Sequence, residues 1–105
     1  MSGERNGPLS YNGSLVLQAL TQGHAYGFEI MRAAHLPSGT VYPLLRRFEA
    51  RGLVESEWES DEQVAGEGRP SRRYYRLRPE GRALLSQSIA ELRAVLTNLG
   101  LERGG

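Results

Sequence analysis

The 105-residue sequence predicts a mainly α fold with one small β-hairpin (α+β), in the order α-α-α-β-β-α. Three observations lead to this class. Three apolar segments separated by short turns fill the first half, and the second and third repeat apolar residues with a helical period of about 3.6. The period then falls to that of a half-buried strand on both sides of a segment containing glycine and proline. The last segment carries apolar residues at heptad spacing, which is typical of a long helix that meets a partner helix.

The first two helices are expected close to the start of the chain. Residues 1–8 are polar and contain glycine and proline, so we expect a flexible arm there. Nearly continuous apolar residues between about 12 and 21 indicate a mostly buried helix. A second, short helix from about 25 to 34 has its apolar residues on one face, and residues 35–37 would join it to the third helix.

A third helix is expected from Ser38 to Arg51, ending before a glycine. Ser38 can cap free backbone amides, and the proline before it keeps residue 36 out of the helical conformation. Four apolar residues between 41 and 48 follow the i, i+3, i+4, i+7 pattern, so this stripe should face the core. The opposite, outer face is then centred on Gly39, Pro43, Arg46 and Ala50, flanked by Tyr42 and Arg47.

A β-hairpin is expected after the third helix. One strand runs through residues 54–58 and the other through 72–77, with Trp58, Tyr75 and Leu77 facing inward. Glutamates at alternate positions of the first strand would then face arginines of the second, so part of the arginine charge is expected to be structural. Residues 60–71 show no apolar periodicity and predict an extended, mobile loop.

The last predicted element is a long helix from Pro79 to about Leu99, with proline at a favoured first position. Its length of about 31 Å exceeds what a core of this size can cover, so we expect a dimer interface, with packing inside one chain as the alternative. The chain then divides into an arm at 1–8, a compact domain at 9–78, a dimerisation helix at 79–100 and a flexible tail at 101–105. The expected dimer residues are Leu85, Ile89, Leu92, Leu96 and Leu99.

Composition excludes several classes of protein. The chain is short enough for one domain, and without cysteine it has no disulfide framework, thiolate metal site or cysteine nucleophile. No carboxylate pair, Ser/His/Asp set, metal cluster or phosphate loop is visible, so we expect no enzyme, no metal and no cofactor. His24 and His35 suit surface or structural roles. No apolar run approaches the roughly 20 residues that span a bilayer, and we expect a cytoplasmic protein without membrane contact.

The charge distribution is more informative than the net charge of +1. All 13 basic residues are arginine, whose planar guanidinium suits phosphate or guanine. Six arginines lie between Arg69 and Arg82, next to a block of six acids between Glu55 and Glu67.

The predicted element order is that of a winged helix-turn-helix, whose third helix enters the major groove of DNA. Small residues on the outer face of that helix allow close approach to the groove, Arg46 and Arg47 can bind guanine or phosphate, and free amides at the helix start can bind phosphate. The open alternatives are a core-edge role for Tyr42 and simple solvation for the two arginines. The candidate DNA-binding residues are Ser38, Gly39, Thr40, Tyr42, Pro43, Arg46 and Arg47, with Arg69, Arg72 and Arg73 from the wing.

Three motifs resemble one known family. Residues 36–54, LPSGTVYPLLRRFEARGLV, closely resemble the recognition-helix signature of PadR-like transcriptional regulators, and residues 68–77, GRPSRRYYRL, resemble their wing signature. Residues 23–30, GHAYGFEI, resemble the second-helix motif, with Phe28 where the family usually has tyrosine. The resemblance covers roughly residues 9–85.

This resemblance implies a homodimer formed through the C-terminal helix, DNA contacts that include Tyr42, a wing on the DNA backbone, and repression more often than activation. The sequence departs from the family at Arg78, where threonine usually caps the last helix, so a poorer cap is expected. A single C-terminal helix resembles the shorter branch of the family, without a separate sensing domain. Some relatives bind aromatic molecules between subunits, but the only tryptophan here, Trp58, falls on the wing, so that site is not transferred and any small-molecule effector is unknown.

The predicted function is that of a sequence-specific regulator of transcription that binds double-stranded DNA, with repression expected. A homodimer would place two recognition helices about 34 Å apart on a pseudo-palindromic operator. The alternative is a winged-helix module that binds protein through the acidic strand at residues 55–59. Only the first reading predicts affinity for duplex DNA that falls steeply with salt.

Overall fold

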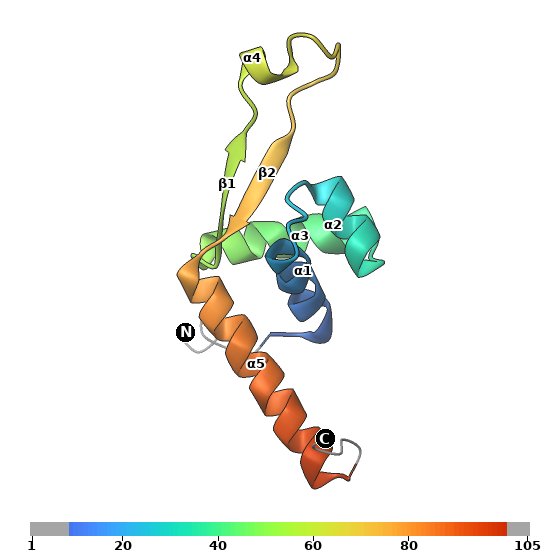
Figure 1. Cartoon of the computed structure of the whole chain (residues 1–105), viewed down its shortest axis with the longest axis vertical. Helices are drawn as coiled ribbons and strands as arrows, with labels where there is room; N and C mark the ends of the chain where they lie inside the picture. The colour runs from blue at the N-terminus through green and yellow to red at the C-terminus, as the bar shows by residue number, and fades with distance from the viewer. Residues whose placement is uncertain (1–8, 101–105) are drawn as a thin grey trace.

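The computed structural model describes residues 9–100 and confirms the predicted order of elements, with one short helix added (Figure 1). The predicted arm at 1–8 and tail at 101–105 lie outside the described residues. Within the described range, no helix is long and apolar enough to cross a membrane. The elements are α1 (Tyr11–Thr21), α2 (Gly27–Ala34), α3 (Ser38–Ala50), β1 (Val54–Trp58), α4 (Asp61–Val64), β2 (Arg73–Leu77) and α5 (Pro79–Asn98).

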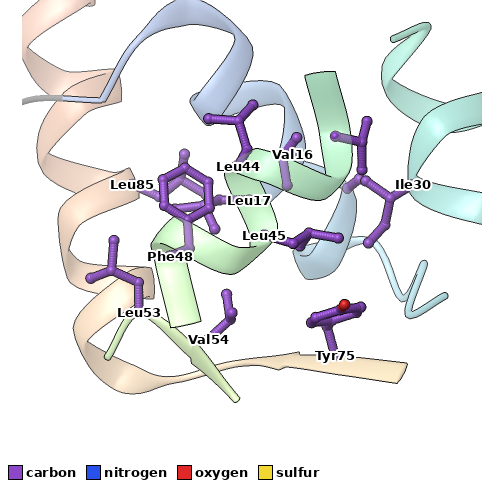
Figure 2. Close-up of a cluster of buried hydrophobic side chains, with 12 residues drawn as sticks. Val16, Leu17, Ile30, Leu44, Leu45, Phe48, Leu53, Val54, Tyr75 and Leu85 are labelled. Atoms are coloured by element: carbon purple, nitrogen blue, oxygen red, sulfur yellow. The ribbon is translucent and has the colours of Figure 1, made fainter. Parts of the chain in front are cut away.

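The core lies where α1, α2 and α3 meet the base of the hairpin and the first turns of α5 (Figure 2). Leu17, Ile30 and Leu45 are fully buried there, one from each of the first three helices. Burying side chains of this size stabilises a fold by about 1.5–3 kcal/mol each. The apolar stripe predicted for residues 41–48 is buried, so the orientation of α3 inferred from the sequence is correct.

The turn between α2 and α3 is held by backbone conformation. His35 ends α2 in the left-handed region at φ 58°, and the amide of Leu36 donates to the carbonyl of Met31 at 3.1 Å. The expected cap role of Ser38 is wrong: Pro37 is the N-cap, and its carbonyl accepts from Thr40 and Val41 at 3.0 Å each. Proline holds the extended conformation a cap needs, so Ser38 becomes the first helical residue.

The hairpin is antiparallel, and Val54 pairs with Leu77 at its base and Trp58 with Arg73 at its outer end. Tyr75 is buried as expected and Leu77 is half-buried, whereas Trp58 is 60% exposed, so its predicted inward position is wrong. The cause is the direction of the strands, which run outward from the helices so that only their base reaches the core (Figure 1). The segment predicted as an extended loop contains the short helix α4.

The long helix α5 begins on the core and then leaves it (Figure 1). Pro79 occupies its first turn, and Arg78 precedes it without a side-chain cap hydrogen bond, as the departure from the family motif predicts. A Cβ at Gly81 would collide with the carbonyl of Leu53, so glycine allows the close contact. Leu85 is only 4% exposed and belongs to the core, while Ile89 and Leu92 further along the helix are exposed.

Candidate nucleic-acid interface

The outer face of α3 carries two arginines that have no acidic partner among residues 9–100. Arg46 and Arg47 are exposed, and no carboxylate within residues 9–100 lies at salt-bridge distance from either guanidinium. Ser38, Gly39 and Ala50 are exposed on the same helix, and Thr40 and Pro43 are half-buried. Small side chains around free guanidinium groups allow a ligand to approach the helix closely.

The start of α3 has unsatisfied polar backbone groups. The amides of Ser38 and Gly39 have no helical carbonyl in front of them, because they belong to the first turn. Pro43, inside the helix, lacks the N–H that would otherwise bond the carbonyl of Gly39. The amides of Ser38 and Gly39 can therefore donate to an anion, and the carbonyl of Gly39 can accept from a base or water.

Tyr42 lies between the outer face and the protein interior. Its ring rests against the backbone of Gly27, where any Cβ would collide with it, and 37% of the residue stays exposed. This position fits both roles considered for Tyr42, a core-edge residue and a DNA contact. The ring packs against α2, and part of it remains available to a ligand. Gly27 is what permits the close approach of α2 and α3 here.

Arg69 is held inside the wing. Its guanidinium contacts the Glu59 carboxylate at 2.7 and 3.2 Å and the Glu67 carboxylate at 2.6 Å. Hydrogen bonds from Arg69, from the backbone amide of Arg72 and from the hydroxyl of Tyr26, of which the bond from Arg69 has the largest effect, together lower the pKa of Glu59 to about 2. In turn, the two carboxylates raise the pKa of Arg69. The arginine expected to contact DNA from the wing thus binds two acids of its own loop.

Tyr26 is a residue that sequence reasoning missed. From the N-cap of α2 its hydroxyl donates to Oε2 of Glu59 at 3.0 Å, and this bond raises the pKa of Tyr26. The guanidinium of Arg72 lies 4.5 Å from the centre of its ring, and the ring of Tyr74 meets it edge-on at 6.0 Å. We call Tyr26, Glu59 and Arg69 the wing latch, because together they tie the hairpin to the start of α2.

No periodic pattern could have revealed the latch, since Tyr26 and Glu59 lie 33 residues apart. Separate contacts of Ala25 shorten α2 by two residues relative to the prediction. Ala25 does not enter the helix because its carbonyl accepts from the amide of Tyr75 at 2.9 Å, and its amide donates to the side chain of Glu29 at 3.1 Å.

The other wing arginines also have partners. Arg73 donates to Oγ of Ser56 at 2.9 Å and lies 3.3 Å from the Glu49 carboxylate. Arg76 lies 3.0 Å from Glu55, its cross-strand neighbour, and 3.5 Å from Glu57. Pairing between the charge blocks is therefore confirmed. Arg72 is half exposed, and its side chain lies 3.7 Å from Glu59.

The outer half of α5 exposes the apolar side chains of Ile89 and Leu92, and Leu99, the C-cap residue that follows it, is exposed as well. Leu96 is half-buried, and Val95, which the heptad pattern omitted, is also exposed. Ile89 and Leu92 line a cavity of about 420 Å³ between α5 and α1. The apolar surface open to a partner helix thus begins after Leu85, which the core of its own chain already covers.

Comparison with known proteins agrees with this arrangement. The model of the transcriptional regulator PadR-like family matches residues 16–87. This chain belongs to the PadR-like family of transcriptional regulators. No curated protein matches it.

Solved PadR structures are similar over most of their length. A PadR family regulator from Clostridium difficile R20291 is 28% identical with a TM-score of 0.74, over 87% of this chain and 96% of that one. A PadR family regulator from Eggerthella lenta is 34% identical with a TM-score of 0.66, over 84% and 80%. Bordetella bronchiseptica BpsR, whose DNA binding is regulated by 6-hydroxynicotinic acid, is 21% identical with a TM-score of 0.68, over 86% and 64%, and shares the fold alone. The PadR-like chain is accordingly a DNA-binding transcription regulator.

Proposed function

We propose that this chain is a sequence-specific repressor that binds double-stranded DNA as a homodimer, with α3 of each subunit in the major groove. The observation that carries the proposal is the exposed face of α3, where Arg46 and Arg47 have no acidic partner among the described residues. An unpartnered guanidinium can bind guanine or phosphate without first giving up a carboxylate.

Different parts of this face have different proposed roles. Arg46 reads base edges and Arg47 binds guanine or phosphate, while Ser38, Gly39 and Thr40 lie at the start of α3, where the free amides of Ser38 and Gly39 hold a phosphate. The small side chain of Pro43 allows the helix to approach the groove closely, and Tyr42 contacts the DNA backbone. From the wing, Arg72 and Arg73 are better placed than Arg69, because Arg69 binds two carboxylates closely.

A homodimer is supported by the apolar surface of α5. Ile89, Leu92, Val95 and Leu99 leave a contiguous stretch of the helix without a covering element. Such a surface is costly in water and suits a second copy of the same helix, at the heptad spacing of the sequence. Two copies would present two α3 helices to half-sites about 34 Å apart.

The first experiment selects bound duplexes from a random pool at two salt concentrations. We expect enriched half-sites related by a two-fold axis, and affinity that falls steeply with salt as phosphates are neutralised. A pool that emerges without sequence enrichment would contradict specific recognition. Repression is tested with the selected operator placed upstream of a reporter gene, where expression should fall.

The dimer is tested by light scattering. The expected mass is twice that of one 11.6 kDa chain, and a mass equal to one chain at micromolar concentration contradicts the proposal. Leu92→Glu should separate the subunits, since a carboxylate would be buried without a partner. Ala90→Glu, at an exposed position on the opposite side of the same helix, is the matched control and should leave the dimer intact.

A protein-binding module is the competing function, with the acidic strand β1 as its surface. The ion pairs of Glu55 with Arg76 and Arg78, and of Glu57 with Arg76, argue against it, because they already engage both carboxylates of that strand. Under this alternative the selection would yield no duplex with salt-dependent affinity.

A further inference from the structure

The hairpin is attached to α3 by a second polar contact, separate from the wing latch. Ser56 on β1 donates from its hydroxyl to Oε2 of Glu49, near the end of α3, at 2.7 Å. Arg73 on β2 donates from Nε to the Ser56 hydroxyl at 2.9 Å and from Nη2 to Oε1 of Glu49 at 3.3 Å. The three side chains form a closed ring of hydrogen bonds, which we call the α3 tie.

The α3 tie joins two elements that share little apolar packing. The strands of the hairpin run outward from the helices (Figure 1). Among the residues of β1 and β2, only Val54 and Tyr75 are buried. A two-stranded hairpin has little stability of its own, so its angle to α3 depends on polar contacts along its faces.

The arginine of the α3 tie also belongs to the surface proposed for DNA. Arg73 lines a cavity of about 420 Å³ between α3 and the hairpin, together with Tyr42, Arg46 and Arg72, and no acidic residue is in that lining. Glu49 is not part of the lining, so its carboxylate holds Arg73 from outside the cavity. A change in the tie would therefore move the arginines of the wing relative to Arg46.

The charge of Glu49 does not explain its position. A carboxylate beside a DNA surface repels phosphates, so by charge alone it weakens binding. Its ion pair with Arg73 is partly exposed, with 35% of the Glu49 side chain and 41% of the Arg73 side chain open to solvent, and pairs of this kind add little stability. A fixed geometry between α3 and the wing is the remaining benefit of the ring of hydrogen bonds.

We propose that Glu49 and Ser56 are positioning residues for DNA binding. They hold Arg73, and with it the wing, at a fixed angle to the recognition helix α3, so that both elements reach the same duplex together. Preorganisation of this kind raises affinity, because the wing does not have to be ordered when DNA binds. This role rests on the proposed function, since it concerns the same DNA surface.

The main test is Glu49→Ala, because charge and positioning predict opposite results. Loss of a negative charge by itself should strengthen binding to every duplex. If the tie positions the wing, affinity for the selected duplex should instead fall roughly three- to tenfold, as expected when a member of a hydrogen-bonded network is removed. Glu57→Ala removes the same charge from the opposite face of β1 and should not weaken binding. The proposal is overturned if Glu49→Ala binds the selected duplex as tightly as the wild type, or more tightly.

Further variants show whether the effect passes through the tie. In a chain that already carries Arg73→Ala, Glu49→Ala should cost less than about twofold, because the side chain that it holds is gone. Ser56→Ala should weaken binding as Glu49→Ala does, whereas Ser56→Thr keeps the hydroxyl and should stay within about twofold of the wild type. Additive losses from Glu49→Ala and Arg73→Ala, or equal losses from the two Ser56 variants, would contradict the tie. Urea unfolding selects conditions in which every variant is folded, so that a loss of stability does not imitate a loss of positioning.

The pattern of the loss separates the positioning role from the proposed function. Base preference is assigned to Arg46, so Glu49→Ala should weaken the selected duplex and its single-base variants by the same factor. Protection of phosphates on the wing side of each half-site should decrease at the same time. If the wild type binds no duplex, the proposed function fails and the positioning role with it. If the wild type binds and Glu49→Ala binds equally well, only the positioning role fails.

Discussion

The arginines of α3 and those of the wing differ in what surrounds them. Arg46 and Arg47 on α3 have no carboxylate at salt-bridge distance within residues 9–100, whereas Arg69, Arg73 and Arg76 of the wing each contact at least one glutamate. Both sets come from the same arginine-rich composition. Arg69 and Arg76 pair with glutamates of the acidic block at residues 55–67, which is itself part of the wing, and Arg73 pairs with Glu49 near the end of α3.

This contrast shows that the number of arginines does not measure the capacity to bind DNA. A paired guanidinium must leave its carboxylate before it can bind a phosphate, and that exchange offsets much of the gain. The charge of the wing mainly fixes the hairpin, while the charge of α3 remains open to a ligand. Substitutions in the two regions should therefore act on different properties: DNA affinity for α3 and stability of the fold for the wing.

The largest effect on DNA binding is expected from Arg46→Ala. Loss of a base contact costs about 1–3 kcal/mol, or roughly 5- to 150-fold in affinity for the selected duplex, and relaxes preference at one base pair of each half-site. Quantitative binding to the selected duplex and its single-base variants measures both changes. Arg82→Ala, which removes one exposed arginine from α5, is the charge-matched control. An equal loss on selected and random duplexes would show that Arg46 contacts only phosphate.

The largest effect on stability is expected from Glu59→Gln. Glu59 ionises with a pKa of about 2 in the folded chain against 4.5 ordinarily, so its stabilisation is fully present above pH 4.5 and is lost as the pH falls toward 2. The variant should unfold at lower urea concentration at neutral pH, and its deficit relative to the wild type should shrink in acid. Glu57→Gln, at an exposed ion pair, is the control. A deficit that stays constant with pH would mean that the carboxylate charge does not hold the latch.

Arg69→Ala separates the two regions most directly. If Arg69 serves the latch, the variant loses stability, while the slope of log K against log salt for DNA binding changes by much less than the roughly 0.9 expected per phosphate contact. Arg47→Ala on α3 is the comparison, and if Arg47 contacts phosphate its slope should fall by about that amount. A comparable fall for Arg69→Ala would show that Arg69 exchanges Glu59 for a DNA phosphate, as the sequence alone suggests.

The sequence predicted the outer face of α3 because the signal is local. A stripe of four apolar residues between 41 and 48 determines which side of one helix is buried, and therefore which side is not. The prediction for Trp58 was wrong because alternation shows which strand residues share a face but not where along the strand the core ends. The partners of Arg69 depend on how the loop between β1 and β2 closes, and that closure has no periodic signature.

For the helix α5, one prediction from the sequence was correct and another was wrong. The heptad spacing correctly indicated a helix longer than its core, yet it assigned Leu85 to the dimer surface together with Ile89. Spacing gives the face of a helix, and both residues do lie on one face. Where that face passes from the core to the surface depends on the position of α1, which no residue of α5 encodes.

The smallest effect is expected from Arg76→Ala. The guanidinium of Arg76 and its partners Glu55 and Glu57 are all about half exposed, and ion pairs of this kind contribute about 0–1 kcal/mol. Unfolding by urea should therefore move little, and affinity for the selected duplex should stay within roughly twofold of the wild type, since no DNA contact is assigned to this residue. The matched comparison is Arg46→Ala, which removes the same side chain from an exposed position without an acidic partner. If Arg76→Ala weakened DNA binding as much as Arg46→Ala, Arg76 would contact DNA in spite of its two glutamate partners, and the wing would contribute to binding beyond Arg72 and Arg73.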